Sequence, residues 1–365
     1  MLTWNLLQAN QQLCLYPRFR RLLLFSIMNY NKPMPRRILT GDNTTGRLHL
    51  GHYVGSLENR ISLQTDYETF IILADLHSFA YPKYVNDPAT ISNSIYQVLM
   101  DNLAVGLDPK KVTFFQESAV PQIYELAAIF SMLVSHNRAL RNPTIKEEIR
   151  DKSMGDNFSL GFIFFPMLQA ADILCVNADL VPVGEDQLPH IEQTNEIAQR
   201  FNALYGNTFK EVQGLVGRVK RLPGVDGNAK MTKSLNNAIY LSETEEELKR
   251  KVMSMHTDPK RLHSTDPGTV EGNPVFIYHD AFNPNKAEVD DLKERYREGR
   301  VGDVEVKEKL YIALNNFLTP IREKRRYYET HLKEVEGILH SGNIKVQLEA
   351  ANILKSTLKA LKLLK

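Results

Sequence analysis

Cysteine is scarce in this sequence, and long apolar runs are absent from it. With only Cys14 and Cys175 in 365 residues, the chain cannot build a disulfide framework, a cysteine-rich metal site or an iron–sulfur site, and a reducing compartment fits this composition. No apolar run approaches the ~20 residues that a membrane span requires. A large charge excess is also missing, because the net charge is only +2. Any contact with nucleic acid must therefore rest on local patches and not on an overall field.

Acidic residues are missing from the N-terminal segment. Residues 1–34 contain no Asp or Glu but carry four basic residues and an apolar patch at 22–25. An organelle-targeting segment has such an acid-free composition. The alternative is a start upstream of the working initiator, which would then be Met28 or Met34. We treat residues 1–33 as an N-terminal extension and keep both interpretations open.

The remaining chain is long enough for two domains of different character. The 43% hydrophobic and 24% charged residues are typical of a globular protein, and 365 residues exceed one ordinary core. Apolar runs at Phe70–Ala74 and Val112–Phe115 predict buried strands, and helical spacing covers about 88–103 and 122–134. From about residue 243 the strand signal disappears. Alternating strands and helices predict an α/β fold with a doubly wound parallel sheet, followed by an α-helical region.

We therefore expect a catalytic α/β domain over residues 34–235 and a helical domain over 236–365. Within the first, the charged residues at about 136–158 predict either a helical insert or a solvated face.

The stretch Thr40–His52 has the pattern of a strand, a turn and a helix. An apolar pair precedes it, and apolar residues recur at helical spacing through residue 61. The unpaired backbone N–H groups at such a helix start favour phosphate. Gly51 would let a base or ribose lie on the backbone, and His49 and His52 stand one turn apart to hydrogen-bond a phosphate chain. Taken alone, the stretch is equally consistent with a polar turn that carries surface histidines.

A second motif lies far downstream, at Lys230–Ser234. Two lysines three residues apart, on a loop preceded by Gly224 and Gly227, are able to close over an anionic group. A solvated loop is the alternative for the lysine pair alone. Together with His49–His52, however, this lysine loop resembles the signature pair of the class I aminoacyl-tRNA synthetases.

Three further motifs narrow the resemblance. Gln169–Leu174, followed by Val181–Gln187, is similar to the bacterial-type tryptophanyl-tRNA synthetases, as is Leu222–Gly227 ahead of the lysine loop. The resemblance covers about residues 36 to 330. It implies a Rossmann-like catalytic domain of the class I synthetase type and a helical domain that binds the tRNA anticodon.

The resemblance also implies an activity and its partners. The expected enzyme is a tryptophan–tRNA ligase that converts L-tryptophan and ATP to tryptophanyl-adenylate and pyrophosphate. It then transfers tryptophan to the 3′ end of tRNA(Trp) and releases AMP. Mg²⁺ would accompany ATP, and a cytoplasmic homodimer is implied, or a mitochondrial protein if residues 1–33 are a transit peptide.

Carried over residue by residue, the resemblance assigns three groups of site residues. The catalytic residues would be His49, His52, Lys230 and Lys233. The ATP site would comprise Asn43, Thr44, Thr45, Gly51, His52, Gly184, Glu185, Asp186, Leu222, Lys230, Met231, Thr232, Lys233 and Ser234. The tryptophan pocket would comprise Asp172, His77, Val181, Val183 and Gln187. The chain departs from the family at Thr232, where serine is usual, and at Asn43–Thr44, where many relatives have glutamine-proline.

Asp172 is the residue on which discrimination between amino-acid substrates would depend. It lies in the largely apolar run from Phe162 to Val176, and a buried carboxylate is costly unless it is paired. Its partner would be a helix N-terminus, an arginine or the substrate. In the last case, a site built around an indole N–H would reject phenylalanine by leaving the carboxylate unpaired.

Three rival interpretations stay open at this point. One is a tyrosine-specific relative of the same fold. A second is a nucleotidyltransferase outside translation, which shares the His-x-Gly-His turn but generally lacks the lysine loop and the helical region. The third is a non-catalytic RNA-binding paralogue, which would not need both histidines and both lysines.

The helical region holds a basic and aromatic stretch at 322–328, with four cations and two adjacent tyrosines. Recognition of unpaired bases uses such combinations. A solvated helix face with core tyrosines would produce the same pattern, so we name no single residue there as a site.

Overall fold

The computed structural model describes residues 36–151, 158–184, 187–216, 222–227, 231, 235–258, 261, 263 and 265–364. In this part of the chain, five parallel strands form one sheet in the order β3-β2-β1-β4-β5. The strands are β1 (Arg37–Asn43), β2 (Glu68–Ala74), β3 (Val112–Gln116), β4 (Leu180–Val183) and β5 (Gln213–Val216). The chain builds outward from β1 to β3 and then returns to the other side of β1. The carboxyl ends of β1 and β4 therefore flank the topological switch point, where ligands bind in such sheets.

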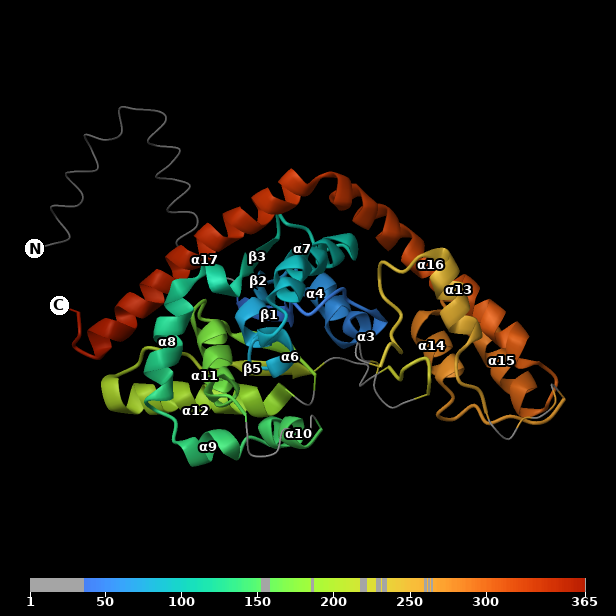
Figure 1. Ribbon diagram of the computed structural model, residues 1–365, viewed down its shortest axis with the longest axis horizontal. Helices are drawn as coiled ribbons and strands as arrows, with labels where there is room; N and C mark the ends of the chain where they lie inside the picture. The colour runs from blue at the N-terminus through green and yellow to red at the C-terminus, as the bar shows by residue number, and fades with distance from the viewer. Residues whose placement is uncertain are drawn as a thin grey trace, which may run out of the picture. The chain divides into compact units, whose positions relative to one another are not determined.

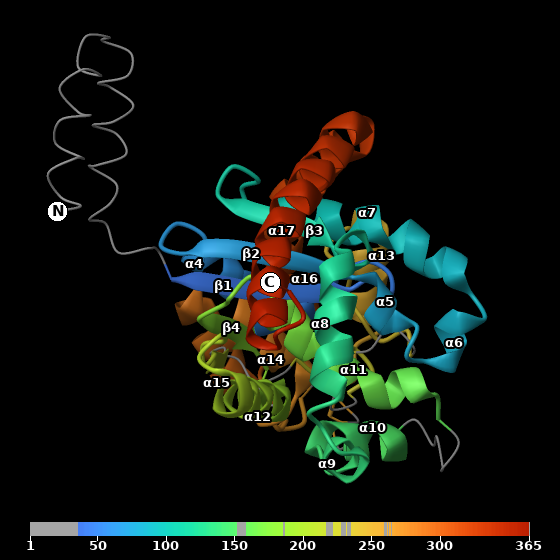
Figure 2. The ribbon, with the colours of Figure 1, turned by 90° about the vertical axis from the view of Figure 1, so that its left-hand side faces the viewer.

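Helices cover both faces of the sheet (Figures 1 and 2). On β2, Ile71 and Leu73 belong to one core with the helices that follow β1 and with α7, whereas Phe70 and Ile72 belong to a second core with α8, α11 and α12. Side chains alternate between the faces of a strand, so a strand buried on both faces is apolar throughout.

The helical elements between β1 and β5 have the following bounds: α3 (Leu50–His52), the π-helical η2 (Tyr53–Leu57), α4 (Glu58–Leu63), α5 (Asp75–Ser78), α6 (Pro82–Val85), α7 (Pro88–Ala104), the 3₁₀ turn η3 (Glu117–Ala119), α8 (Pro121–Ser131), α9 (His136–Leu140), α10 (Pro143–Asp151), α11 (Leu160–Leu174) and α12 (Leu188–Tyr205).

The downstream part of the chain is helical, as the sequence predicts. Its helices are α13 (Glu245–Met253), α14 (Pro274–Phe282), α15 (Lys286–Arg297), α16 (Asp303–Thr330) and α17 (Leu332–Ala360). Residues of α14 and α16 share the first core with β2 and α7. The fold class is confirmed, and the domain boundary near residue 235 stays a prediction.

The long helix α17 lies along the edge strand β3 (Figure 1). There the side-chain Oδ1 of Asn343 accepts the Gln116 backbone N–H at 2.8 Å. A Cβ atom on Gly342 would stand 1.8 Å from the Phe114 carbonyl oxygen. The helix thus occupies an edge that would otherwise expose backbone groups, and it approaches close enough that only glycine fits.

The structure refines two local expectations and adds one strand that the sequence does not predict. Strand β1 runs to Asn43, so Thr40–Asn43 belong to the strand and not to the turn. The charged region at about 136–158 forms α9 and α10 in its described part. Strand β5 was not predicted, because its four residues are all exposed and lack a continuous apolar run. None of the described helices combines the length and the apolarity that a membrane-spanning segment needs.

Candidate active site

A cavity of about 1040 Å³ opens at the carboxyl edge of the sheet. The ends of β1 and β4 form its floor, from Leu39 to Asn43 and from Val181 to Gly184. Parallel strands present their carboxyl ends at the same edge, so polar residues that follow different strands meet there. The cavity accordingly gathers side chains from β1, the helix start at His49, α5, α11 and β4.

The signature turn (Thr44–His52) ends in a helix start that its own histidines cap. His49 Nδ1 accepts the Gly51 backbone N–H at 3.1 Å, and His52 Nδ1 accepts the His49 N–H at 3.2 Å. An Nδ1 that accepts a hydrogen bond carries no proton, so a neutral ring holds its hydrogen on Nε2. The two ring centroids lie 3.9 Å apart. Both histidines line the cavity, and both rings are set to donate hydrogen bonds through Nε2.

Glycine at position 51 is required by this arrangement. A Cβ atom there would stand 2.9 Å from the His49 ring and 3.5 Å from Met231 Sδ. Any side chain would therefore displace the His49 ring from its capping position.

A buried ionic cluster supports the end of β1. Asp42 binds Arg60 through both carboxylate oxygens, at 2.6 and 3.0 Å, and accepts the side-chain N–H of Asn102 at 3.0 Å. Arg60 also donates to the Gly41 carbonyl at 2.8 Å. Burial alone would raise the pKa of Asp42, but the adjacent guanidinium outweighs it, and the pKa of Asp42 is lowered. The strand end is thereby tied to α4 and α7.

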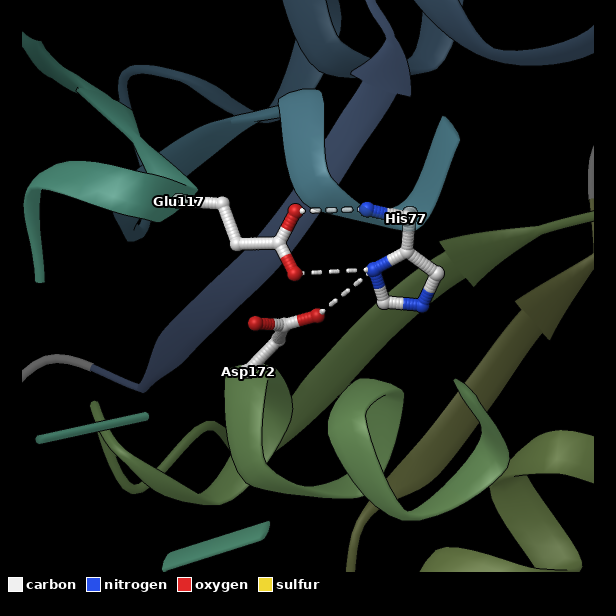
Figure 3. A group of neighbouring side chains, drawn as sticks. All are labelled: His77, Glu117 and Asp172. Carbon is white, nitrogen blue, oxygen red and sulfur yellow. Dashed lines mark hydrogen bonds and ion pairs between the residues drawn. The ribbon is translucent and has the colours of Figure 1, made fainter. Parts of the chain in front are cut away.

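Three side chains from three elements meet (Figure 3), and two of them, His77 and Asp172, line the cavity. His77 lies on α5, Glu117 on η3 and Asp172 on α11. His77 Nδ1 lies 3.0 Å from Glu117 Oε1 and 3.6 Å from Asp172 Oδ2. All three atoms that could bind a metal lie within 4.8 Å of one another. Glu117, however, already receives two backbone N–H groups, from Leu76 and His77, so we interpret the group as a hydrogen-bond network.

Two buried polar atoms of this group have no hydrogen-bond partner among the described residues: Asp172 Oδ1 and His77 Nε2. Asp172 is only 3% exposed. Burial, together with the negative charges of Glu117 and Asp75, raises the pKa of Asp172 well above its ordinary range. Unpaired buried polar atoms are rare and costly. Of the partners expected from the sequence, no helix N-terminus and no arginine among the described residues engages Oδ1, and the substrate stays a prediction.

The structure brings many of the predicted site residues together on the cavity wall. These are Asn43, Thr45, His49, His52, His77, Asp172, Val181, Val183, Gly184, Gln187 and Met231. Thr44, Gly51 and Leu222 are not on the wall; Thr44 and Leu222 are buried, and Gly51 lies under His49. Glu185, Asp186, Lys230, Thr232, Lys233 and Ser234 lie outside the described residues. The role of each residue stays a prediction.

Sequence reasoning missed three residues of the cavity region. Phe165 and Gln169 line the wall with Asp172, and their spacing of four and three residues places all three on one face of α11. Glu117 follows the buried strand β3 directly, so its position at the carboxyl edge was the available signal.

Of the basic stretch at 322–328, Arg325 is buried and forms an ion pair with Asp101. Tyr327 is exposed and stacks on His331 with ring centroids 4.0 Å apart.

Comparisons with known proteins agree with this geometry. Residues 31–319 match the family of tRNA synthetases class I (W and Y). The tryptophan–tRNA ligase of Chlamydia caviae is 49% identical over 310 residues, which cover 84% of this chain and 90% of that protein. The tryptophan–tRNA ligase of Borreliella burgdorferi is 46% identical over 88% of this chain and 92% of its own length.

A solved structure extends the comparison. The tryptophanyl-tRNA synthetase of Campylobacter jejuni, complexed with ADP and tryptophan, superposes with a TM-score of 0.78 at 28% identity. The match covers 89% of this chain and 99% of that one. Fold and site thus define a class I aminoacyl-tRNA synthetase. Within that class, the chain belongs to the family of bacterial-type tryptophanyl-tRNA synthetases.

Proposed function

We propose that this protein activates L-tryptophan with ATP and transfers it to tRNA(Trp). One observation carries the proposal: the cavity lined by His49 and His52 is also lined by Asp172, whose Oδ1 has no hydrogen-bond partner in the described part of the chain. Such an atom supplies a hydrogen-bond acceptor for an indole N–H. A carboxyl group keeps an accepting oxygen whether it is ionised or protonated, so the raised pKa of Asp172 is compatible with this role.

The chemistry requires positioning more than it requires a base. A tryptophan carboxylate oxygen attacks the α-phosphorus of ATP, and the bond to the bridging oxygen of pyrophosphate breaks. This gives tryptophanyl-adenylate and pyrophosphate. The attacking carboxylate is already ionised, so alignment and neutralisation of phosphate charge supply the acceleration. In the second step, the terminal ribose 2′-hydroxyl of the tRNA attacks the carbonyl carbon, and AMP leaves.

His49 and His52 would donate Nε2–H to the phosphates, and Gly51 would lie under the nucleotide. In the same proposal, the ATP site includes Asn43, Thr44, Thr45, Gly184, Glu185, Asp186, Leu222 and Met231, while Lys230, Thr232, Lys233 and Ser234 close over pyrophosphate. His77, Val181, Val183 and Gln187 would shape the tryptophan pocket around Asp172.

ATP would arrive as its Mg²⁺ complex. The carboxylate of Asp42 lines the cavity but is committed to Arg60 and Asn102. We therefore expect the ion to be held mainly by the phosphates and by water, as is usual for Mg²⁺.

The helical region at 236–365 would bind tRNA, beside a catalytic domain at 34–235. A homodimer and a cytoplasmic location belong to the same proposal, or a mitochondrial location if residues 1–33 act as a transit peptide. Sedimentation of the purified protein would test the dimer.

The deciding experiment is amino-acid-dependent exchange between ATP and labelled pyrophosphate, run with each proteinogenic amino acid. We expect exchange with tryptophan alone, and its loss in Asp172→Ala with ATP binding retained. Exchange with tyrosine but not tryptophan would identify the tyrosine-specific relative. No exchange with any amino acid would favour a nucleotidyltransferase or a non-catalytic paralogue.

A further inference from the structure

Glu117 is the most buried member of the group in Figure 3, with 0% of its surface exposed. Its Oε2 accepts the backbone N–H groups of Leu76 at 3.1 Å and His77 at 3.2 Å. Its Oε1 lies 3.0 Å from His77 Nδ1. This carboxylate therefore contacts the histidine at both its backbone and its ring.

These contacts define where the hydrogen on His77 lies. Two backbone N–H donors already occupy Oε2, and a carboxylate offers only acceptors. Oε1 must then receive its hydrogen bond from Nδ1–H of His77. A hydrogen on Nε2 as well would be a buried donor without a partner among the described residues, which is costly. The neutral ring with Nδ1–H leaves Nε2 as an open acceptor.

We propose that Glu117 is a positioning residue of the amino-acid pocket, which holds His77 as the Nδ1–H tautomer so that Nε2 accepts an N–H of the substrate. The proposal rests on the proposed function for the identity of that substrate. Tryptophan carries two kinds of N–H donor, the indole and the ammonium group. Two buried atoms of the pocket, Asp172 Oδ1 and His77 Nε2, have no hydrogen-bond partner among the described residues and are placed to accept hydrogen bonds.

The Glu117→Gln variant gives a direct test, because its side chain has one acceptor and one donor. With the amide oxygen on the two backbone N–H groups, the amide N–H faces His77 Nδ1. That N–H can bond only to an Nδ1 without a hydrogen, so we expect the ring to carry its hydrogen on Nε2, which converts the open acceptor into a donor. Glu125 on α8 is exposed, so Glu125→Gln is the matched control.

The tautomer is read from two-bond ¹H–¹⁵N correlation spectra of protein labelled at histidine nitrogens, with His77→Gln to assign the signal. We expect Nδ1–H in the wild type, in Glu125→Gln and in Glu117→Asp, which keeps an acceptor-only side chain. We expect Nε2–H in Glu117→Gln. An Nε2–H tautomer in the wild type, or an Nδ1–H tautomer in Glu117→Gln, overturns the proposal. The measurement needs no substrate, so it is separate from any failure of the proposed function.

Exchange kinetics give the functional readout. We expect the KM for tryptophan to rise about tenfold or more in Glu117→Gln, the cost of one mismatched buried hydrogen bond. The KM for ATP should be unchanged, and Glu117→Asp should recover part of the loss. A wild-type KM for tryptophan in a variant with the inverted tautomer overturns the role of Nε2.

Indole-3-propionate, which lacks the ammonium group, distinguishes the two donors when it is used as a competitor. If its inhibition constant is the same in wild type and Glu117→Gln, the ammonium group is the donor to Nε2. If the constant rises as far as the KM for tryptophan does, the indole N–H is the donor.

Discussion

Asp101 joins the signature turn to Arg325 on α16. Its Oδ2 accepts the backbone N–H of Leu48 at 2.7 Å, directly before His49, and its Oδ1 forms a buried ion pair with Arg325. Arg325 also donates to the Gln97 carbonyl at 2.8 Å. The turn is thus anchored through α7 to α16, and Arg325 follows Asp101 by 224 residues in the sequence.

Removal of the guanidinium from this pair should be strongly destabilising. Arg325→Met leaves the Asp101 carboxylate buried without its counter-charge, which costs about 3–5 kcal/mol. Urea denaturation would measure the loss in the free energy of unfolding. Arg326 is exposed on the same helix, so Arg326→Met should change stability by no more than about 0.5 kcal/mol. Equal stability of the two variants would contradict a structural role for the pair.

Two glycines of α17 should respond to alanine in opposite directions. At Gly342 the new Cβ would meet the Phe114 carbonyl oxygen at 1.8 Å, whereas at Gly337 it would meet nothing within 4 Å. Gly342→Ala should push α17 from β3 and lower stability by about 1–3 kcal/mol. Gly337→Ala should raise it by about 0.5–1 kcal/mol, because alanine is the better helix former. Thermal unfolding of both variants checks the pair, and a neutral Gly342→Ala would show that the contact is not tight.

Gly51→Ala should impair catalysis more than folding. Its Cβ would displace the His49 ring, which lies 2.9 Å away, while a Cβ on Gly55, in the same helical segment, would meet nothing within 4 Å. If His49 donates to phosphate, kcat for pyrophosphate exchange should fall about 10²-fold, the usual cost of one misplaced donor. Gly55→Ala should keep near-wild-type kcat. Similar kcat values in the two variants would remove His49 from the reaction.

Asp172 should make stability depend on pH. Its pKa is raised above the ordinary 3.8, so the folded protein keeps a proton that the unfolded chain loses. Stability therefore falls as pH rises above about 4 and levels off only above the folded pKa. Asparagine does not ionise, so the stability of Asp172→Asn relative to the wild type should increase from pH 4 to pH 8, by about 1.4 kcal/mol for each unit of pKa difference. Urea denaturation of both proteins across this range measures the difference in their free energies of unfolding. A difference that stays constant with pH would show that the carboxyl is ionised throughout and would contradict the prediction.

Much of the fold was predictable because its determinants are local. Continuous apolar runs such as Phe70–Ala74 mark strands buried on both faces, and Gly106 ends α7 with a φ of 110° that favours glycine. Strand β5 escaped prediction, since an exposed four-residue strand depends on the neighbour it pairs with and not on its own pattern.

The sequence by itself determined the family, the motifs and the alternation of strands and helices, because spacing and residue type carry that information along the chain. Only the tertiary structure decided that Asp172 Oδ1 has no partner among the residues that the structure describes, that Glu117 contacts the His77 ring, and that Arg325 is buried against Asp101 instead of facing solvent. Burial and hydrogen-bond pairing are relations between residues far apart in sequence. They exist only once the sheet and its helices have brought those residues together.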